Sequence, residues 1–153
     1  MLIRRGDANR PEGTGLSRCF CFVSVSYERL PVKVRSLPHL TPNDQAAVTE
    51  YIARIRSTFP DRVLAVILFG SKARGDADTE SDIDLLVLVD AESNEFRSEL
   101  WRIASDVSLE YNVVLSVRVF GRARWAEMRR IRLPLYRAIV ADGVPLTPER
   151  ISA

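Results

Sequence analysis

Two short apolar segments, with polar residues between them, limit most strongly how this chain can fold. Residues 63–69 read Val-Leu-Ala-Val-Ile-Leu-Phe, and residues 83–89 are apolar apart from one aspartate. Segments of this length and composition predict strands that are buried in a sheet. We therefore expect two strands, with the polar residues 70–82 between them.

The polar stretch begins with residues suited to hold a phosphate. Gly70 allows a tight turn and the approach of a bulky anion, and Ser71 offers both its N–H and its hydroxyl. If a short helix begins next, its first N–H groups add the positive end of a helix dipole. Lys72 and Arg74 bring positive charge to this turn, although an exposed position in solvent is the alternative for Lys72.

Two carboxylates stand at the start of the second expected strand. Asp82 and Asp84 are two residues apart, so their side chains point to one face, while Ile83 and Leu85 point into the core. Crowded carboxylates repel unless something neutralises them, and Mg²⁺ prefers carboxylate oxygens completed by water and substrate phosphates. Two such ions could activate an attacking hydroxyl and stabilise a departing pyrophosphate. The pair is therefore a candidate catalytic and metal-binding site.

Together, the turn and the acid pair resemble a known family. A Gly-Ser-x-x-x-Gly turn followed by Asp-x-Asp on the next strand is similar to the polymerase-beta-like nucleotidyltransferase superfamily, above all to its minimal nucleotidyltransferase (MNT) domains. The resemblance extends over about residues 41–146. The hallmark Gly-Ser-x-Ala-Arg-Gly and Ser-Asp-hydrophobic-Asp-Leu is filled here by Gly70, Ser71, Ala73, Arg74, Gly75, Ser81, Asp82, Asp84 and Leu85.

The resemblance implies a fold and a reaction. The fold is α/β (α+β), a small mixed β-sheet with flanking helices. The reaction transfers a nucleoside monophosphate, AMP from ATP, to an acceptor hydroxyl with Mg²⁺, as two ions. Asp82 and Asp84 would be the catalytic and metal-binding residues. The nucleotide-binding residues, which seat the triphosphate and balance its charge, would be Gly70, Ser71, Lys72 and Arg74.

One position departs from the pattern of the family. Active members usually carry a third carboxylate on the strand after the next helix, where the aligned residue here is Ser116. Serine is a poor metal ligand at neutral pH, and the nearest acid, Glu110, would need a different register to reach the site. The chain is therefore either a two-carboxylate enzyme or a fold that has kept nucleotide binding and lost efficient transfer.

Helices and strands alternate from residue 41 onward. Thr41 is suited to cap a helix that ends at Pro60, and residues 94–110 show one apolar face. Residues 113–120 predict the strand that contains the aligned serine, and residues 121–146 predict one or two short helices. This order suits a mixed α/β sheet rather than a doubly wound fold.

The expected helices at residues 121–146 are rich in arginine. One interpretation is a surface that binds triphosphate, RNA or an acidic protein. The other, which we favour, is a solvated helix face above a buried apolar stripe. Nucleic acid is accordingly a possible but not a favoured partner. The expected stripe consists of Trp125, Met128, Ile131 and Leu135.

Composition indicates a single small globular domain with a basic leader. The 153 residues are 46% hydrophobic and 27% charged, and no apolar stretch approaches the roughly 20 residues that span a bilayer. Residues 1–40 carry a net charge of +4, which leaves −2 for the rest of the chain. We expect a poorly ordered leader at 1–40, with a targeting peptide as the alternative, a nucleotidyltransferase domain at 41–147 and a C-terminal tail at 148–153.

The two cysteines and the single histidine do not predict a metal site or a catalytic site. Cys19 and Cys21 have the wrong spacing for a zinc knuckle and fit reduced thiols in the cytoplasm. His39 is alone in the chain, and an exposed loop position is expected for it.

The small size of the chain points to a partner. We expect no extra helical domain of the kind that often holds an acceptor, so the acceptor surface would come from a partner, from a second copy or from the acceptor itself. MNT domains of this kind resemble antitoxins paired with helical HEPN ribonucleases, which implies transfer of AMP to such a toxin. The alternative is a non-catalytic module that neutralises a HEPN-type partner by direct binding.

Overall fold

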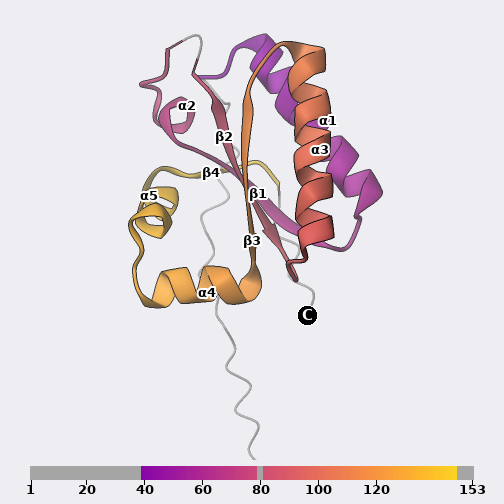
Figure 1. The fold of residues 1–153 in the computed structure, drawn as a ribbon. Helices are drawn as coiled ribbons and strands as arrows, with labels where there is room; N and C mark the ends of the chain where they lie inside the picture. The colour runs from indigo at the N-terminus through magenta and orange to yellow at the C-terminus, as the bar shows by residue number, and fades with distance from the viewer. Residues whose placement is uncertain (1–38, 79–80, 148–153) are drawn as a thin grey trace, which may run out of the picture.

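A mixed sheet between two layers of helices forms the described part of the protein. The computed structural model describes residues 39–78 and 81–147, and its strands lie in the order β3-β2-β1-β4 (Figure 1). The elements are α1 (Pro42–Thr58), β1 (Val63–Phe69), α2 (Ser71–Arg74), β2 (Ile83–Val89), α3 (Asn94–Tyr111), β3 (Leu115–Gly121), α4 (Arg122–Arg130), α5 (Pro134–Asp142) and β4 (Val144–Pro145). The expected α/β class, a small mixed sheet with flanking helices, is confirmed.

Some expectations concern residues outside the described ranges. The leader up to residue 38, with Cys19 and Cys21, and the tail at 148–153 lie outside them. His39, the first described residue, is exposed as expected.

Side-chain caps set the ends of the two long helices. Thr41 Oγ1 accepts a hydrogen bond from the Asp44 N–H, and Asp44 Oδ2 accepts one from the Thr41 N–H, both at 3.1 Å, so α1 starts with a capping box. Ser93 Oγ accepts from the Phe96 N–H at the start of α3, and Asn112 ends it in the left-handed conformation. None of the described helices has both the length and the apolar character needed to cross a membrane.

The sheet combines antiparallel and parallel pairing. β1 pairs antiparallel with β2 and with β4, whereas β2 and β3 run parallel because α3 crosses between them. β3 begins two residues later than expected. The Val113 N–H still donates to the Ser108 carbonyl at 3.1 Å, so residue 113 helps to close the end of α3 instead of joining the strand.

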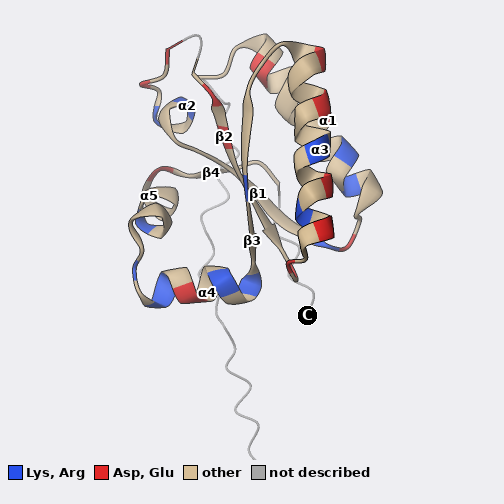
Figure 2. Cartoon of the chain, viewed as in Figure 1, with Lys and Arg blue, Asp and Glu red and all other residues tan. Residues whose placement is uncertain are grey.

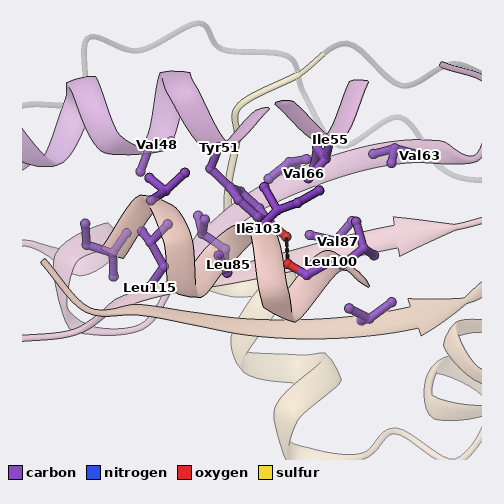
Figure 3. Packing of buried hydrophobic residues seen from close by; sticks show 14 of the residues in the cluster. Val48, Tyr51, Ile55, Val63, Val66, Leu85, Val87, Leu100, Ile103 and Leu115 are labelled. Atoms are coloured by element: carbon purple, nitrogen blue, oxygen red, sulfur yellow. Dashed lines mark hydrogen bonds between the residues drawn. The ribbon is translucent and has the colours of Figure 1, made fainter. Parts of the chain in front are cut away.

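The larger core lies between the sheet and the α1 and α3 layer. Alternate residues of β2, among them Leu85 and Val87, pack here against both helices (Figure 3). Tyr51 of α1 is fully buried in this core, and its hydroxyl donates a 3.4 Å hydrogen bond to the Leu100 carbonyl of α3. The two long helices are therefore joined to each other as well as to the sheet.

A smaller core fills the other face of the sheet, beneath α4 and α5. Leu86 and Leu88 of β2 pack there against Trp125 and Met128, which are buried as expected. Ile131 was expected in the same stripe, but it is 49% exposed because α4 ends at Arg130 and the chain turns away.

Candidate active site

The acid pair lies on the sheet face that carries the smaller core. Ile83 and Leu85 are buried on the α1 and α3 side, whereas Asp84 is partly exposed on the opposite side, in line with Leu86. The alternation of strand residues puts Asp82, which is exposed, on the same side as Asp84. No ion pair involves either aspartate among residues 39–78 and 81–147. Two neighbouring carboxylates thus remain open to a cation from solution.

The turn after β1 touches this pair through Gly70. Phe69, the last residue of β1, is in register with Asp84 of β2. Gly70 has φ +79, and a β-carbon built at this position would overlap the Asp84 carboxylate. Both the backbone angle and the close approach therefore require glycine.

Ser71 begins α2 next to this contact and is partly exposed. The helix has only four residues, so few peptide dipoles are aligned in it. Its individual backbone N–H groups would therefore attract an anion more than a helix macrodipole would. Arg74 is exposed, and its Nε lies 3.1 Å from Asp76 Oδ2. A surface ion pair of this kind is weak, which leaves the guanidinium able to turn toward an anion.

Lys72 has a different environment from its neighbours. Its side chain is 4% exposed, and its Nζ lies 2.8 Å from Oδ2 of Asp44, which is also buried. The alternative of an exposed Lys72 is therefore wrong. Its charge is neutralised by α1, on the other face of the sheet from Asp84. From the sequence, Asp44 had only the role of an acid in the first turn of a helix.

A pocket of about 610 Å³ lies beside this buried ion pair. Asp44, Lys72 and Ser81 line it together with the end of α3, while Asp82 and Asp84 do not. The two carboxylates are thus not part of the pocket lining, and the acid pair rather than the cavity marks the candidate active site.

The register of β3 decides which residue stands beside the acid pair. Ser116 is the direct partner of Asp84 on the parallel strand, so the serine occupies the place expected for a third carboxylate. Glu110 lies on α3, and its Oε2 is 2.6 Å from Arg54 Nη2 of α1, so it is engaged in the other layer. No group of three or more potential metal ligands of the His, Cys, Asp or Glu type exists in the described part of the chain.

The arginine-rich segment divides into paired and unpaired residues. Arg122 Nε lies 3.0 Å from Asp90 Oδ1, and Arg130 Nη2 lies 2.7 Å from Glu127 Oε1. Arg124 instead lies over the Phe120 ring, 5.7 Å from its centroid. These three arginines lie on α4, outside the turn that follows β1. They are therefore distinct from the residues of that turn, which the sequence predicts to bind phosphate.

Comparison with known proteins identifies the family. The model of a family described as "Nucleotidyltransferase domain" matches residues 48–141, more than half of the chain, including the turn and both aspartates. The chain belongs to this family. The matched domain contains the Gly70 turn, β2 and β3.

Curated relatives come from the archaeon Methanocaldococcus jannaschii. MJ0141 is 38% identical over 76 residues, which cover 49% of this nucleotidyltransferase chain and 77% of the relative. MJ0604 is 29% identical over 101 residues, which cover 66% of this chain and 95% of the relative. Both are named, provisionally, protein adenylyltransferases.

Solved structures show weaker similarity. A toxin-antitoxin crystal structure with AMP-PNP is 23% identical, with 67% of this chain and 73% of that chain covered and a TM-score of 0.47. A nucleotidyltransferase, so named provisionally, from Sulfolobus solfataricus is also 23% identical, with 69% and 79% covered and a TM-score of 0.42.

Proposed function

We propose that this domain transfers AMP from ATP to a hydroxyl group on a protein partner. The observation that carries the proposal is the open pair Asp82 and Asp84, set against the Gly70 turn at the end of β1. The names of the archaeal relatives support ATP as donor and a protein as acceptor. By the resemblance to MNT domains, the partner would be a helical protein of the HEPN type.

The proposed reaction is an in-line displacement at the α-phosphorus. The acceptor oxygen forms a bond to this phosphorus, and the bond from the phosphorus to the α,β-bridging oxygen breaks. Pyrophosphate leaves with the bonding electrons, and the proton of the acceptor hydroxyl passes to solvent because Ser116 offers no carboxylate beside Asp84. Ser71 would donate to triphosphate oxygens, and Arg74 would balance their charge.

Mg²⁺ would be held by Asp82 and Asp84. The donors fit this ion, because Mg²⁺ binds through one or two carboxylates and completes its shell with water and substrate phosphates. When bound, the ion supplies neutralisation of the charge on the triphosphate and on the leaving pyrophosphate. A second ion would have to take most of its ligands from the substrate, since the residue in register with Asp84 is Ser116.

Calorimetric titration of ATP, GTP, CTP and UTP tests this proposal. We expect ATP to bind in the presence of Mg²⁺ and binding to be lost in Asp82→Asn and Asp84→Asn, which keep the side-chain size and remove the charge. Asp106→Asn, at an exposed position on α3, is the matched control and should bind ATP like the wild type. Binding that persists in both site variants would refute the assignment of the acid pair.

A second function is favoured by the serine at position 116. A nucleotidyltransferase fold without the third carboxylate could neutralise its partner by binding alone. In that case Asp82→Asn would leave neutralisation of the partner unchanged in cells, whereas the transfer mechanism requires that neutralisation be lost. Following growth of cells that express the partner with each variant separates the two functions.

A further inference from the structure

Arg118 lies on the sheet face of the acid pair and is not used by the proposed reaction. It follows Ser116 by two residues on β3, so its side chain leaves the strand on the same side. The residue is exposed, and it belongs to no ion pair of the described residues. The backbone of Arg118 therefore lies about 7 Å along the strand from Ser116, the residue beside Asp84.

The strand order puts Arg118 across the site from the triphosphate. β2 lies between β1, which leads into Gly70 and Ser71, and β3, which carries Arg118. In an in-line displacement the attacking oxygen and the leaving pyrophosphate lie on opposite sides of the phosphorus. If the triphosphate is seated at the Gly70 turn, the acceptor approaches from the β3 side.

A second free arginine extends this side of the site. Figure 2 shows acidic positions at the start of β2 and mostly basic positions along α4, which follows β3 directly. Arg124 of α4 is exposed and lies over Phe120, which points to the same sheet face as Arg118. The neighbouring Arg122 and Arg130 lie beside acids, whereas Arg118 and Arg124 form a short strip of exposed arginines with no ion pair to an acid of the described residues.

We propose that Arg118, with Arg124 beyond it, binds an acidic side chain next to the acceptor hydroxyl, so that the acceptor is an acidic segment of polypeptide. This proposal rests on the proposed function for the direction from which the acceptor arrives. Arginine forms forked hydrogen bonds to carboxylates, and the strip offers two guanidinium groups for them. A protein is already the acceptor class of the proposed function. The positive charge of Arg118 and Arg124 is thus complementary to a short anionic peptide.

The experiment compares three synthetic peptides that differ only around one tyrosine. The tyrosine is flanked by glutamates, by glutamines or by lysines, and binding to the full chain is measured by fluorescence anisotropy with AMP-PNP and Mg²⁺ present. We expect the glutamate peptide to bind about tenfold more tightly than the glutamine peptide. An oligouridylate of similar charge is included as an RNA probe.

Variants at position 118 test whether the preference arises there. Arg118→Ala should remove the preference for glutamate, Arg118→Lys should keep part of it, and Arg118→Glu should favour the lysine peptide. Arg56→Ala is the control, because Arg56 lies on α1 in the opposite layer, and it should leave the preference intact. Equal binding of the glutamate and glutamine peptides, or a preference unchanged in Arg118→Ala, would overturn the proposal. Tighter Arg118-dependent binding of the oligouridylate would overturn its polypeptide part.

Failure of this proposal is distinguishable from failure of the proposed function. ATP affinity is measured separately by calorimetry, and we expect it to be unchanged in Arg118→Ala. Normal ATP binding without a peptide preference contradicts the acceptor assignment alone. A peptide preference that depends on Arg118 without any ATP binding contradicts the nucleotidyl transfer and leaves the anion-binding strip in place.

Discussion

Lys72 and Asp44 form a buried ion pair that joins α2, directly after the Gly70 turn, to the first helix α1, with 2.8 Å between Nζ and Oδ2. The two residues are 28 positions apart, and the same Asp44 oxygen also accepts from the Thr41 N–H that starts α1. The pair therefore fixes α2 relative to α1 as well as neutralising two buried charges.

Removal of one partner should destabilise the protein strongly. Lys72→Met leaves the Asp44 carboxylate buried without its counterion, and we expect a loss of about 3–5 kcal/mol in the free energy of unfolding. Asp44→Asn/Lys72→Met removes both charges and should recover part of this loss. Urea denaturation measures both, with Arg102→Ala at an exposed ion pair as the control, for which little change in stability is expected. A Lys72→Met protein as stable as the wild type would contradict this role.

Gly70→Ala should damage both stability and the candidate site. A positive φ costs a non-glycine residue about 1–3 kcal/mol, and the new β-carbon would also displace the Asp84 carboxylate. We expect ATP affinity to fall below detection in calorimetry. The same substitution in an Asp84→Ala background should cost less stability, since the overlap with the carboxylate is then removed. Equal costs in the two backgrounds would show that Gly70 and Asp84 do not interact.

Ser116→Asp should restore a third carboxylate beside Asp84. Without Mg²⁺ the added charge repels Asp84 and should lower Tm, whereas Mg²⁺ should raise the Tm of this variant more than that of the wild type. Transfer of label from α-labelled ATP should increase by about tenfold if the serine limits catalysis. Ser116→Asn, which has the same size without the charge, controls for shape. A Tm of Ser116→Asp that does not respond to Mg²⁺ would argue against the register.

Trp101→Phe should expose the free edge of the sheet. The indole Nε1 donates a 3.1 Å hydrogen bond to the Val117 carbonyl on the outer strand β3. Loss of this bond should cost about 0.5–1.5 kcal/mol and leave an acceptor open to pairing with another chain. We expect sedimentation analysis to show more self-association of the variant at high concentration. Ser105→Ala, on the same helix, should remain like the wild type.

Tyr51 should make the protein sensitive to alkali. Burial raises the pKa of the Tyr51 hydroxyl well above its usual value. The folded state therefore resists deprotonation, and stability from this residue is complete below the unfolded pKa, near about 10, and decreases as pH rises toward the folded pKa. The urea midpoint of the wild type should fall above about pH 10 more steeply than that of Tyr51→Phe. Tyr111→Phe, at a half-buried position, is the control, and parallel profiles for wild type and Tyr51→Phe would contradict the assignment.

Local patterns predicted much of the fold and could not supply contacts between distant residues. Hydrophobic periodicity and helix capping are local properties of the sequence. They predict the cap at Thr41, the strands at 63–69 and 83–89, and the alternation of Asp84 with buried neighbours. The partner of Lys72 depends on how α1 packs against α2, and nothing near Lys72 in the sequence encodes it. Ile131 was placed in the core because helical spacing does not reveal where a helix ends.

The candidate site was predicted as a set of residues but not as an arrangement. The spacing of Asp82 and Asp84 predicted that both side chains lie on one face of the sheet. The register of β2 with β3 places Ser116 beside Asp84, as expected from the resemblance to the family. Arg118 was overlooked, although its two-residue spacing from Ser116 was a usable signal. Attention to charged residues that alternate with Ser116 on an expected strand would have found it.

At the start of β2, Ile83 and Leu85 build the larger core, whereas Asp82 and Asp84 on the other face lie ahead of the smaller core and are open to solvent. Substitutions at outward positions, on this strand or at Ser116 on β3, can therefore accumulate without repacking the interior. A lineage with this fold could lose or regain its chemistry in single mutational steps while its scaffold stays intact. An insertion of one residue in β2, by contrast, would exchange the two faces and destroy both at once.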